Sequence, residues 1–379
     1  MVWRRCCLTE VNRSREPELH RLVSSPGTIL SLRHYAAASA AAARRVVVLV
    51  HGLVASADIF DIPGLPGLSL ARSLAGRGFE VVTYDQRGSG GSTARSVDFG
   101  LREHAWIDLP AVLRFALELT GTGPDALVLG GHSLGGVLLY LQQIAARSGG
   151  EGLFGPAVGR AFTLASPALF DPSWWPWNRL RRGGHAFVAD LDVDGDGMVS
   201  RDEFVAGQSR LRCPAVGRLV RPWMIGAAIR AGSLLPWIGG LLRFAPLPTY
   251  IYGRRDFSNW GFWRLLRSRA LDRAPRRLFY ELVDATADGG RLRLTTDDHA
   301  AVLPADLSAL ANLKLLTVSS RRDHFVPWQS VRAVASYLPE AEYVLTEERF
   351  GRSSGHAGYL FRPGLAPRLQ ELVADFAGR

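Results

Sequence analysis

Residues 131–135 have the sequence Gly-His-Ser-Leu-Gly, and they follow the apolar run Ala-Leu-Val-Leu at residues 126–129. Behind them, residues 136–141 have the composition of a helix start. Strand, G-x-S-x-G turn and helix in this order form a nucleophile elbow, whose strained turn holds a serine hydroxyl clear of the sheet. Glycines at both ends of the turn let the flanking backbones approach each other. The pattern predicts Ser133 as a nucleophile, and a glycine-rich surface turn is the alternative.

A serine hydroxyl needs a base to activate it, and the base needs an acid to orient it. In folds with such an elbow, the acid and then the histidine follow the serine along the chain. Asp323 follows the apolar run 313–318, so it belongs to a loop at a strand end, where open parallel sheets place their ligand chemistry. His356 lies among small residues after the last expected strand. We therefore predict that Asp323 orients His356 and that His356 activates Ser133.

Other residues have suitable chemistry for the acid or the base. They are His324, Asp297, Asp298, His299, Asp85 and His132. His324 adjoins Asp323, but adjacent loop residues rarely face each other. Asp297 and Asp298, together with His299, precede the last two expected strands. They are the fallback acid and base. Asp85 belongs to a turn, and His132 is expected to pack structurally.

The tetrahedral oxyanion of an acyl transfer needs two backbone donors. The N–H of Leu134, directly after the nucleophile, is expected to be one of them. The loop after the expected strand 46–50 should supply the other. Gly52 lets this loop turn, and we predict the N–H of Leu53 as the second donor, with Val54 as the nearest alternative. An ordinary strand-to-helix turn is the competing interpretation.

Apolar runs and helical spacing alternate along much of the chain. Strands are expected at residues 28–35, 46–50, 79–84, 126–129, 161–165, 313–318 and 341–346, and a helix is expected at 106–120. Such alternation predicts an α/β fold with a mostly parallel central sheet and helices on both faces.

The alternation fails over a long middle section, which predicts an insertion. We expect an N-terminal tail at 1–22, a core at 23–170, an insertion at 171–290 and the rest of the core at 291–379. Seven of the ten tryptophans fall in the insertion: Trp174, Trp175, Trp177, Trp223, Trp237, Trp260 and Trp263. Arg221, Arg230 and Arg243 interrupt its apolar section 216–252, so surface-lying amphipathic helices are expected there rather than a membrane span.

These pieces together resemble an α/β-hydrolase. The matching residues are 51–53, 84–90, 131–136, Asp323 and His356. Residues 51–57 also resemble acid lipases, and residues 108–111 with 119–121 are similar to both acid lipases and polyhydroxyalkanoate synthases. Those synthases carry a cysteine where this chain has Ser133, which favours hydrolysis over polymer synthesis. The resemblance implies an α/β-hydrolase fold with a largely helical cap at the insertion.

Residues 192–203, Asp-Val-Asp-Gly-Asp-Gly-Met-Val-Ser-Arg-Asp-Glu, match the 12-residue EF-hand calcium loop. The expected ligands at loop positions 1, 3, 5, 7 and 12 are Asp192, Asp194, Asp196, the Met198 carbonyl and Glu203. Gly197 provides the sharp turn at position 6, and Ser200 can hold a water at position 9. Four carboxylates this close repel one another unless a cation neutralises them.

The pattern therefore predicts a Ca²⁺ site, and an acidic turn without metal is the alternative. EF-hands usually pair, whereas one copy is visible here, so a second could come from another chain. A structural calcium that orders the cap is the preferred role, and a calcium that reshapes a lid over the site is the regulatory alternative.

Composition limits the other classes of function. The chain has 379 residues and a net charge of +10, carried almost entirely by arginine because Lys314 is its single lysine. No nucleic-acid motif accompanies this charge, so no nucleic-acid partner is expected, while contact with an anionic membrane surface stays open. The three cysteines, Cys6, Cys7 and Cys213, show no disulfide spacing. Neither a secretory signal nor a membrane span is recognised, so a cytoplasmic location is expected.

The residues together predict a serine hydrolase that cleaves carboxylic esters, and the apolar, tryptophan-rich insertion favours a hydrophobic acyl group. Two alternatives stay open. One is an acyltransferase or hydroxyalkanoate polymer enzyme, in which an alcohol or thiol replaces water. The other is a non-catalytic, calcium-dependent protein that binds a membrane or a partner. The oligomeric state does not follow from the sequence.

Overall fold

The computed structural model describes residues 16–38, 45–149, 151–174, 177–212, 221–234, 256 and 258–379. The three cysteines and most of the apolar section 216–252 lie outside the described residues, and the expectations about them stay predictions.

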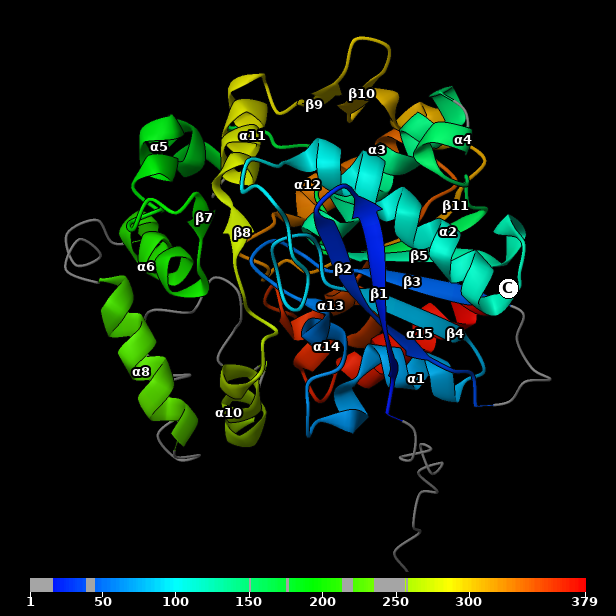
Figure 1. Ribbon diagram of the computed structural model, residues 1–379, viewed down its shortest axis with the longest axis horizontal. Coiled ribbons are helices and arrows are strands. Elements are labelled where there is room, and N and C mark those ends of the chain that lie inside the picture. The colour runs from blue at the N-terminus through cyan, green and yellow to red at the C-terminus, as the bar shows by residue number, and fades with distance from the viewer. Residues whose placement is uncertain are drawn as a thin grey trace, which may run out of the picture.

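An eight-stranded sheet forms the centre of the molecule (Figure 1). In spatial order its strands are β1 (Glu18–Ser25), β2 (Thr28–Tyr35), β4 (Glu80–Tyr84), β3 (Val46–Val50), β5 (Leu127–His132), β6 (Arg160–Leu164), β11 (Lys314–Ser319) and β12 (Glu342–Leu345). The β1–β2 and β2–β4 pairs are antiparallel, and every pair from β4 to β12 is parallel. The carboxyl ends of the parallel strands therefore meet at one edge.

The predicted mostly parallel sheet is confirmed, and the seven expected strands coincide with β2, β3, β4, β5, β6, β11 and β12. Every residue of β3, β5 and β6 is buried, as continuous apolar strands in a parallel sheet require. One boundary is corrected: β1 begins at Glu18, inside the segment 1–22 expected as a tail. This strand lies at the sheet edge and is largely exposed, so it lacks the apolar run that marks the inner strands.

Helices cover both faces of the sheet. In Figure 1, α2 (Leu109–Thr120), α3 (Leu134–Gly149) and α12 (Trp328–Tyr337) lie above it, and α1 (Leu70–Gly76) and α15 (Ala366–Gly378) lie below. The shorter elements of this part are η1 (Ala57–Phe60), η2 (Pro66–Leu68), η3 (Glu103–Asp108), η4 (Pro124–Ala126), α4 (Glu151–Phe154), η5 (Ala305–Leu310), α13 (Thr346–Phe350) and α14 (Gly358–Phe361). A separate hairpin joins β9 (Leu292–Thr295) to β10 (Ala300–Leu303).

The helix expected at 106–120 begins as a π-helical turn, η3, before α2 continues it. At their junction the Asp108 carboxylate is buried and forms an ion pair with Arg87, with 2.6 Å between Oδ1 and Nη2. Burial raises the pKa of Asp108, and the Arg87 guanidinium opposes that effect. This ion pair ties the helix start to the turn after β4.

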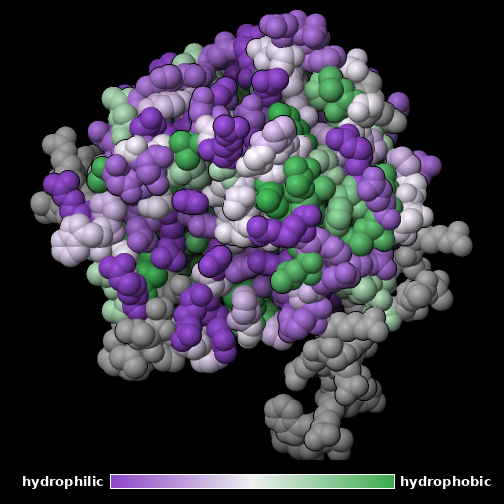
Figure 2. Space-filling view, in the orientation of Figure 1, coloured by the Kyte–Doolittle hydropathy of each residue, from purple (hydrophilic) through white to green (hydrophobic). Residues whose placement is uncertain are grey.

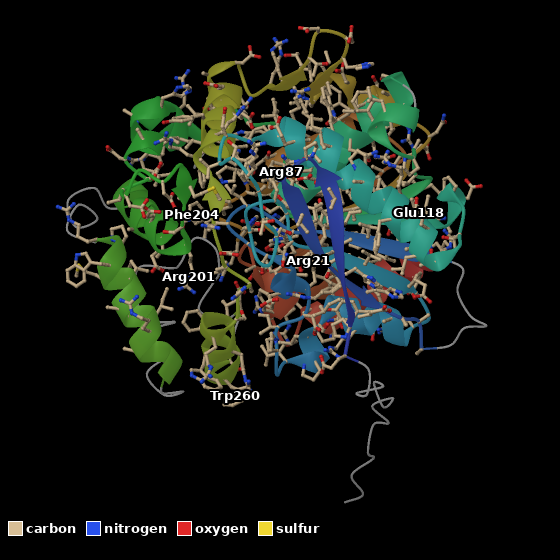
Figure 3. The ribbon with its side chains drawn as sticks, viewed as in Figure 1. Arg21, Arg87, Glu118, Arg201, Phe204 and Trp260 are labelled. Atoms are coloured by element: carbon tan, nitrogen blue, oxygen red, sulfur yellow. The ribbon has the colours of Figure 1, made fainter. Side chains whose placement is uncertain are left out.

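Between β6 and β9 the chain forms a largely helical cap to one side of the sheet (Figure 1). Its helices are α5 (Trp177–Ala189), α6 (Arg201–Arg212), α8 (Pro222–Leu234), α10 (Asn259–Arg267) and α11 (Arg276–Ala287). Short strands β7 (Met198–Val199) and β8 (Ala274–Pro275) pair antiparallel within it. Figure 3 places Arg201 and Phe204 on α6, and Trp260 on α10 at the lower end of the cap.

The outer surface of this view is mostly hydrophilic, with apolar patches that stay separate from one another (Figure 2). Within the described part of the chain, no helix combines the length and apolar character needed to cross a membrane.

Candidate active site

The G-x-S-x-G turn lies between β5 and α3 and has a strained backbone. Ser133 follows β5 and has a φ of +56°, a left-handed conformation that an L-residue adopts only under strain. Its N–H donates to the Leu164 carbonyl at 2.9 Å, so the neighbouring strand β6 holds the turn. A Cβ on Gly135 would lie 2.0 Å from the carbonyl oxygen of Val50, so the start of α3 can pass β3 this closely only with glycine there.

The structure brings the three predicted side chains of Ser133, His356 and Asp323 together. The Nδ1–H of His356 donates to Asp323 Oδ2 at 2.9 Å, because a carboxylate can only accept. That tautomer leaves Nε2 as an acceptor, and the Ser133 hydroxyl lies 2.8 Å from it. All three side chains are buried. The other Asp323 oxygen accepts the backbone N–H groups of Phe325 and Val326, which fixes the carboxylate plane.

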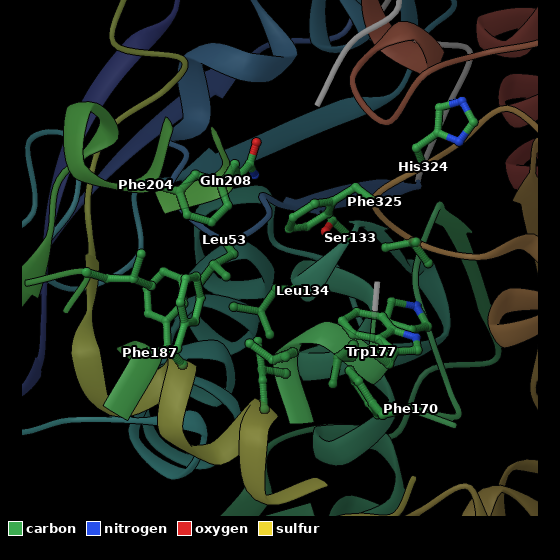
Figure 4. Close-up of a pocket in the computed structure, with 17 residues that line it drawn as sticks. Leu53, Ser133, Leu134, Phe170, Trp177, Phe187, Phe204, Gln208, His324 and Phe325 are labelled. Carbon is green, nitrogen blue, oxygen red and sulfur yellow. The ribbon is translucent and has the colours of Figure 1, made fainter. Parts of the chain in front are cut away.

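The alternative acids and bases lie elsewhere. His324 is exposed, and in Figure 4 its ring points away from Ser133. Asp297 and Asp298 are exposed on the turn between β9 and β10. The buried Asp85 carboxylate accepts the backbone N–H groups of Ala57 and Gly91 and so holds two loops together.

His132 has a supporting contact to the loop that carries the candidate base. Its Nε2–H donates to the backbone carbonyl of His356 at 3.0 Å. Burial lowers the pKa of His132 to about 3, with the neighbouring His356 as a smaller cause, so this imidazole is neutral at physiological pH. The contact matches its predicted structural role.

The two predicted oxyanion donors flank the serine. Leu53 and Leu134 line one pocket with Ser133. In the described part of the chain, neither backbone N–H donates to another protein group. Val54, the alternative donor, has a φ of +53°, which is a strained value for a β-branched residue. The backbone thus changes direction directly after Leu53.

The loop that carries Leu53 is held from two sides. His51 Nε2 accepts the N–H of Gln86, and the Gln86 side chain donates to the His51 carbonyl at 2.6 Å. The segment returning from the cap forms the other side, where the N–H of Asp272 donates to the Val54 carbonyl at 3.0 Å. Sequence reasoning missed this second contact, because no local pattern links residues so far apart in the chain.

Asp256 is another residue that sequence reasoning missed. It is buried, and its Oδ2 accepts the N–H of Gly355, next to His356, at 3.1 Å. A Cβ on Gly358 would lie 2.5 Å from Asp256 Cγ, so the loop packs directly on this carboxyl group. Asp256 thus positions the loop of His356 from the cap side.

An apolar pocket opens at Ser133 (Figure 4), with about 870 Å³ of empty space when its open mouth is included. The core side of the pocket consists of Leu53, Ser133, Leu134, Val137, Pro167, Phe170, His324, Phe325 and Val326. The cap contributes Trp177, Leu180, Phe187, Leu191, Phe204, Gln208, Phe279 and Leu282. The pocket thus lies between core and cap.

The EF-hand-like loop lies in the same cap, between α5 and α6. Carboxylate oxygens of Asp192, Asp194 and Asp196 all lie within 4.8 Å of one another. Asp192 Oδ2 accepts from Arg276 and from the N–H of Gly197, whereas its buried Oδ1 has no hydrogen-bond partner among the described residues.

The other predicted ligands lie beside these aspartates in the loop. The Glu203 carboxylate accepts the N–H groups of Val193 and Ser200, and it is not among the three clustered carboxylates. Met198, whose carbonyl is the expected ligand at position 7, begins β7. Because β7 pairs with β8 of the same chain, this edge of the loop is already paired without a second EF-hand.

A family described as the alpha/beta hydrolase fold matches residues 45–143. Comparison with curated proteins gave no match. Among solved structures, the chain is similar to a hydrolase from Pseudomonas aeruginosa PA01, with 18% identity, a TM-score of 0.54 and coverage of 95% of this chain and 98% of that chain. It is also similar to an esterase from Exiguobacterium antarcticum, with 14% identity, a TM-score of 0.51 and coverage of 95% of this chain and 99% of that chain. A third similar structure is a thermophilic esterase from Thermogutta terrifontis, with 17% identity, a TM-score of 0.51 and coverage of 95% of this chain and 97% of that chain. The sheet, the elbow and these likenesses show that the chain has the α/β-hydrolase fold.

Proposed function

We propose that this protein is a serine hydrolase that cleaves carboxylic esters. One observation carries the proposal: a continuous chain of hydrogen bonds runs from Asp323 through His356 to the hydroxyl of Ser133. Such a chain activates a serine for attack on an acyl carbon. Two of the similar solved structures are named as esterases, which supports the choice of esters.

In the proposed reaction the Ser133 oxygen attacks the ester carbonyl carbon, and His356 Nε2 takes the hydroxyl proton. Asp323 stabilises the imidazolium and holds its tautomer. The N–H groups of Leu53 and Leu134 donate to the oxyanion. His356 then gives the proton to the leaving alcohol, which breaks the ester bond and leaves an acyl-serine. A water that loses its proton to His356 attacks the acyl carbon. His356 then returns this proton to the Ser133 oxygen as the acyl–oxygen bond breaks, which releases the acid and restores the hydroxyl.

The pocket supports a hydrophobic acyl group, because apolar side chains form nearly all of its lining. A serine also stands where the similar polymer synthases carry a cysteine, which favours water over a growing polymer chain as the acyl acceptor. Adding a competing alcohol and measuring transesterified product against free acid tests this choice. More transesterified product than free acid would instead favour an acyltransferase.

The test of the proposed function is the hydrolysis of p-nitrophenyl esters of increasing acyl length. We expect Ser133→Ala to lower kcat by about 10⁴-fold or more, as removal of a serine nucleophile does elsewhere. Ser166→Ala is the matched control, because Ser166 is a buried serine at the end of the neighbouring strand and is not part of the proposed machinery. Circular dichroism checks that both variants fold. Activity retained by a folded Ser133→Ala variant would contradict the proposal.

We also propose that the loop 192–203 binds Ca²⁺ as a structural ion of the cap. The 12-residue pattern provides the oxygen ligands that Ca²⁺ prefers. The unpartnered, buried Oδ1 of Asp192 supports this assignment, because such an atom needs a partner and lies beside two other carboxylates. Asp192, Asp194, Asp196, the Met198 carbonyl and Glu203 would hold the ion, which would order the two helices that flank the loop.

A further inference from the structure

Besides the indole N–H of Trp177, three polar side chains are among the described residues that line the pocket: Ser133, Gln208 and His324. His324 is exposed, and the Ser133 hydroxyl is hydrogen-bonded to His356. Gln208 differs from both, because it is only 5% exposed and, in the part of the chain that the structure describes, neither its amide nitrogen nor its amide oxygen has a hydrogen-bond partner. Figure 4 shows its amide beside Phe204 in the same pocket as Ser133.

We infer that Gln208 binds a hydroxyl group on the acyl chain, and so selects hydroxyacyl esters over unsubstituted ones. This inference rests on the proposed function, which places the acyl chain in this pocket.

Helix α6 places Gln208 in the wall of the pocket. Gln208 is four residues after Phe204, so the two side chains lie on the same face of the helix, and both line the pocket. The Phe204 ring packs against Phe279 and Phe325, with centroid distances of 5.8 Å and 5.9 Å. At the preceding residue, Gly207, an added Cβ would lie 2.0 Å from Leu191 Cδ2, so the helix packs closely on Leu191 there. These contacts fix the rotation of the helix and hold Gln208 in the wall of the pocket.

A buried amide without partners destabilises whatever state contains it, because the amide has lost its hydrogen bonds to water. An unsubstituted acyl chain leaves both Gln208 atoms unpaired. A chain with a hydrogen-bonding group at the right position restores a bond. A site built to pair a polar group discriminates strongly against an analogue that lacks it.

The chemistry of the lining specifies a neutral group that both donates and accepts. The Gln208 amide offers N–H donors and a carbonyl acceptor, and a hydroxyl group can pair with either. The described lining residues include no Asp, Glu, Lys or Arg, so a charged group on the chain would be buried without a counter-charge. A hydroxyl therefore fits the site better than a carboxylate or an ammonium group.

The test compares p-nitrophenyl octanoate with the p-nitrophenyl esters of octanoates hydroxylated at carbon 3, 6, 7 or 8. For each hydroxy ester, the ratio of its kcat/KM to that of the octanoate is measured in the wild type and in Gln208→Met, which keeps the side-chain length but removes the amide. We expect the wild type to prefer at least one hydroxy ester, and Gln208→Met to lower that ratio by about tenfold or more. Gln208→Leu serves as a second variant.

Gln370→Met is the matched control. Gln370 is a buried glutamine of α15 whose amide nitrogen also lacks a partner, but it lines a different small pocket. Its substitution should leave the hydroxy-to-octanoate ratio unchanged.

The outcomes separate this inference from the proposed function. If all esters are cleaved and the wild type prefers octanoate to every hydroxy ester, the inference is overturned and the esterase stands. An equal ratio in the wild type and Gln208→Met overturns it too. If the wild type cleaves no ester at all, the proposed function fails and the inference fails with it.

Discussion

At the scale of single residues, backbone strain is concentrated around the candidate site. Among the described residues, the non-glycine residues with positive φ are Val54, Ser133 and Ala165. Each comes after the end of a neighbouring parallel strand, and Val54 directly follows a proposed oxyanion donor. Such conformations cost about 1–3 kcal/mol each and persist where the surrounding structure enforces them, often at functional sites. Their clustering supports a pre-organised site around the Ser133 hydroxyl.

The carboxylate of Asp323 gives the prediction at this scale. In Asp323→Asn the amide oxygen can still accept the N–H groups of Phe325 and Val326, so the fold should persist. An amide NH₂ facing His356 Nδ1 would favour the wrong imidazole tautomer. We expect kcat for ester hydrolysis to fall by about 10⁴-fold with little change in KM.

Steady-state kinetics checks this prediction, with the exposed Asp297→Asn as the control. A loss of less than about tenfold in a folded Asp323→Asn variant would remove Asp323 from the proposed mechanism.

At the scale of elements, the site depends on how closely the start of α3 passes β3. The prediction concerns Gly135, where a methyl group would collide with the Val50 carbonyl. Backbone atoms cannot move aside as a flexible side chain can, so we expect Gly135→Ala to lower the free energy of unfolding by about 3 kcal/mol or more, at the upper end of overpacking effects.

Gly76→Ala is the matched control, because Gly76 also lies in a helix and an added Cβ meets no atom within 4 Å. That substitution should stabilise the protein by about 0.5–1 kcal/mol. Urea unfolding curves measure both variants. Equal stability of the two would contradict the close packing of the elbow.

The elements differ in how far the sequence predicts them. The inner strands were predictable because strands buried on both faces are continuous apolar runs. The grouping of Ser133, Asp323 and His356 could be proposed because the elbow identifies the serine. The order of residues along the chain then limits the candidates for the acid and the base. The edge strand β1 was missed because its exposed face carries no such run.

The contacts made by Asp256, Asp272 and Gln208 were not predictable. They join residues distant in the sequence, and they depend on how the cap packs on the core, which no local periodicity encodes.

At the scale of the whole molecule, the cap connects the proposed calcium loop to the candidate base. Glu203 is followed directly by Phe204, whose ring packs against Phe325. The Phe325 ring in turn packs against the His356 imidazole, with centroids 4.8 Å apart. The conformation of the loop 192–203 is therefore expected to affect the pocket wall and the contacts of His356.

The prediction at this scale concerns calcium and thermal stability. An ion that binds only the folded state stabilises it by about 2.7 kcal/mol at 100 times its Kd. We expect added Ca²⁺ to raise the Tm of protein treated with a chelator and to raise kcat/KM for long-chain esters, because α5 and α6 line the pocket.

Asp194→Asn should abolish the calcium-dependent rise in Tm. Asp202→Asn should not, because position 11 of the loop is not a ligand position. Differential scanning fluorimetry measures the shift. The same Ca²⁺-dependent shift in Asp194→Asn as in the wild type would contradict the proposed site.

Covalent trapping with a fluorophosphonate, followed by peptide mapping by mass spectrometry, tests directly whether Ser133 is the nucleophile. We expect a single phosphonyl adduct on Ser133 in the wild type, and a large loss of labelling rate in His356→Ala because the hydroxyl then lacks its base. An adduct on another residue, or wild-type protein that stays unlabelled under conditions that label a known serine esterase, would contradict it.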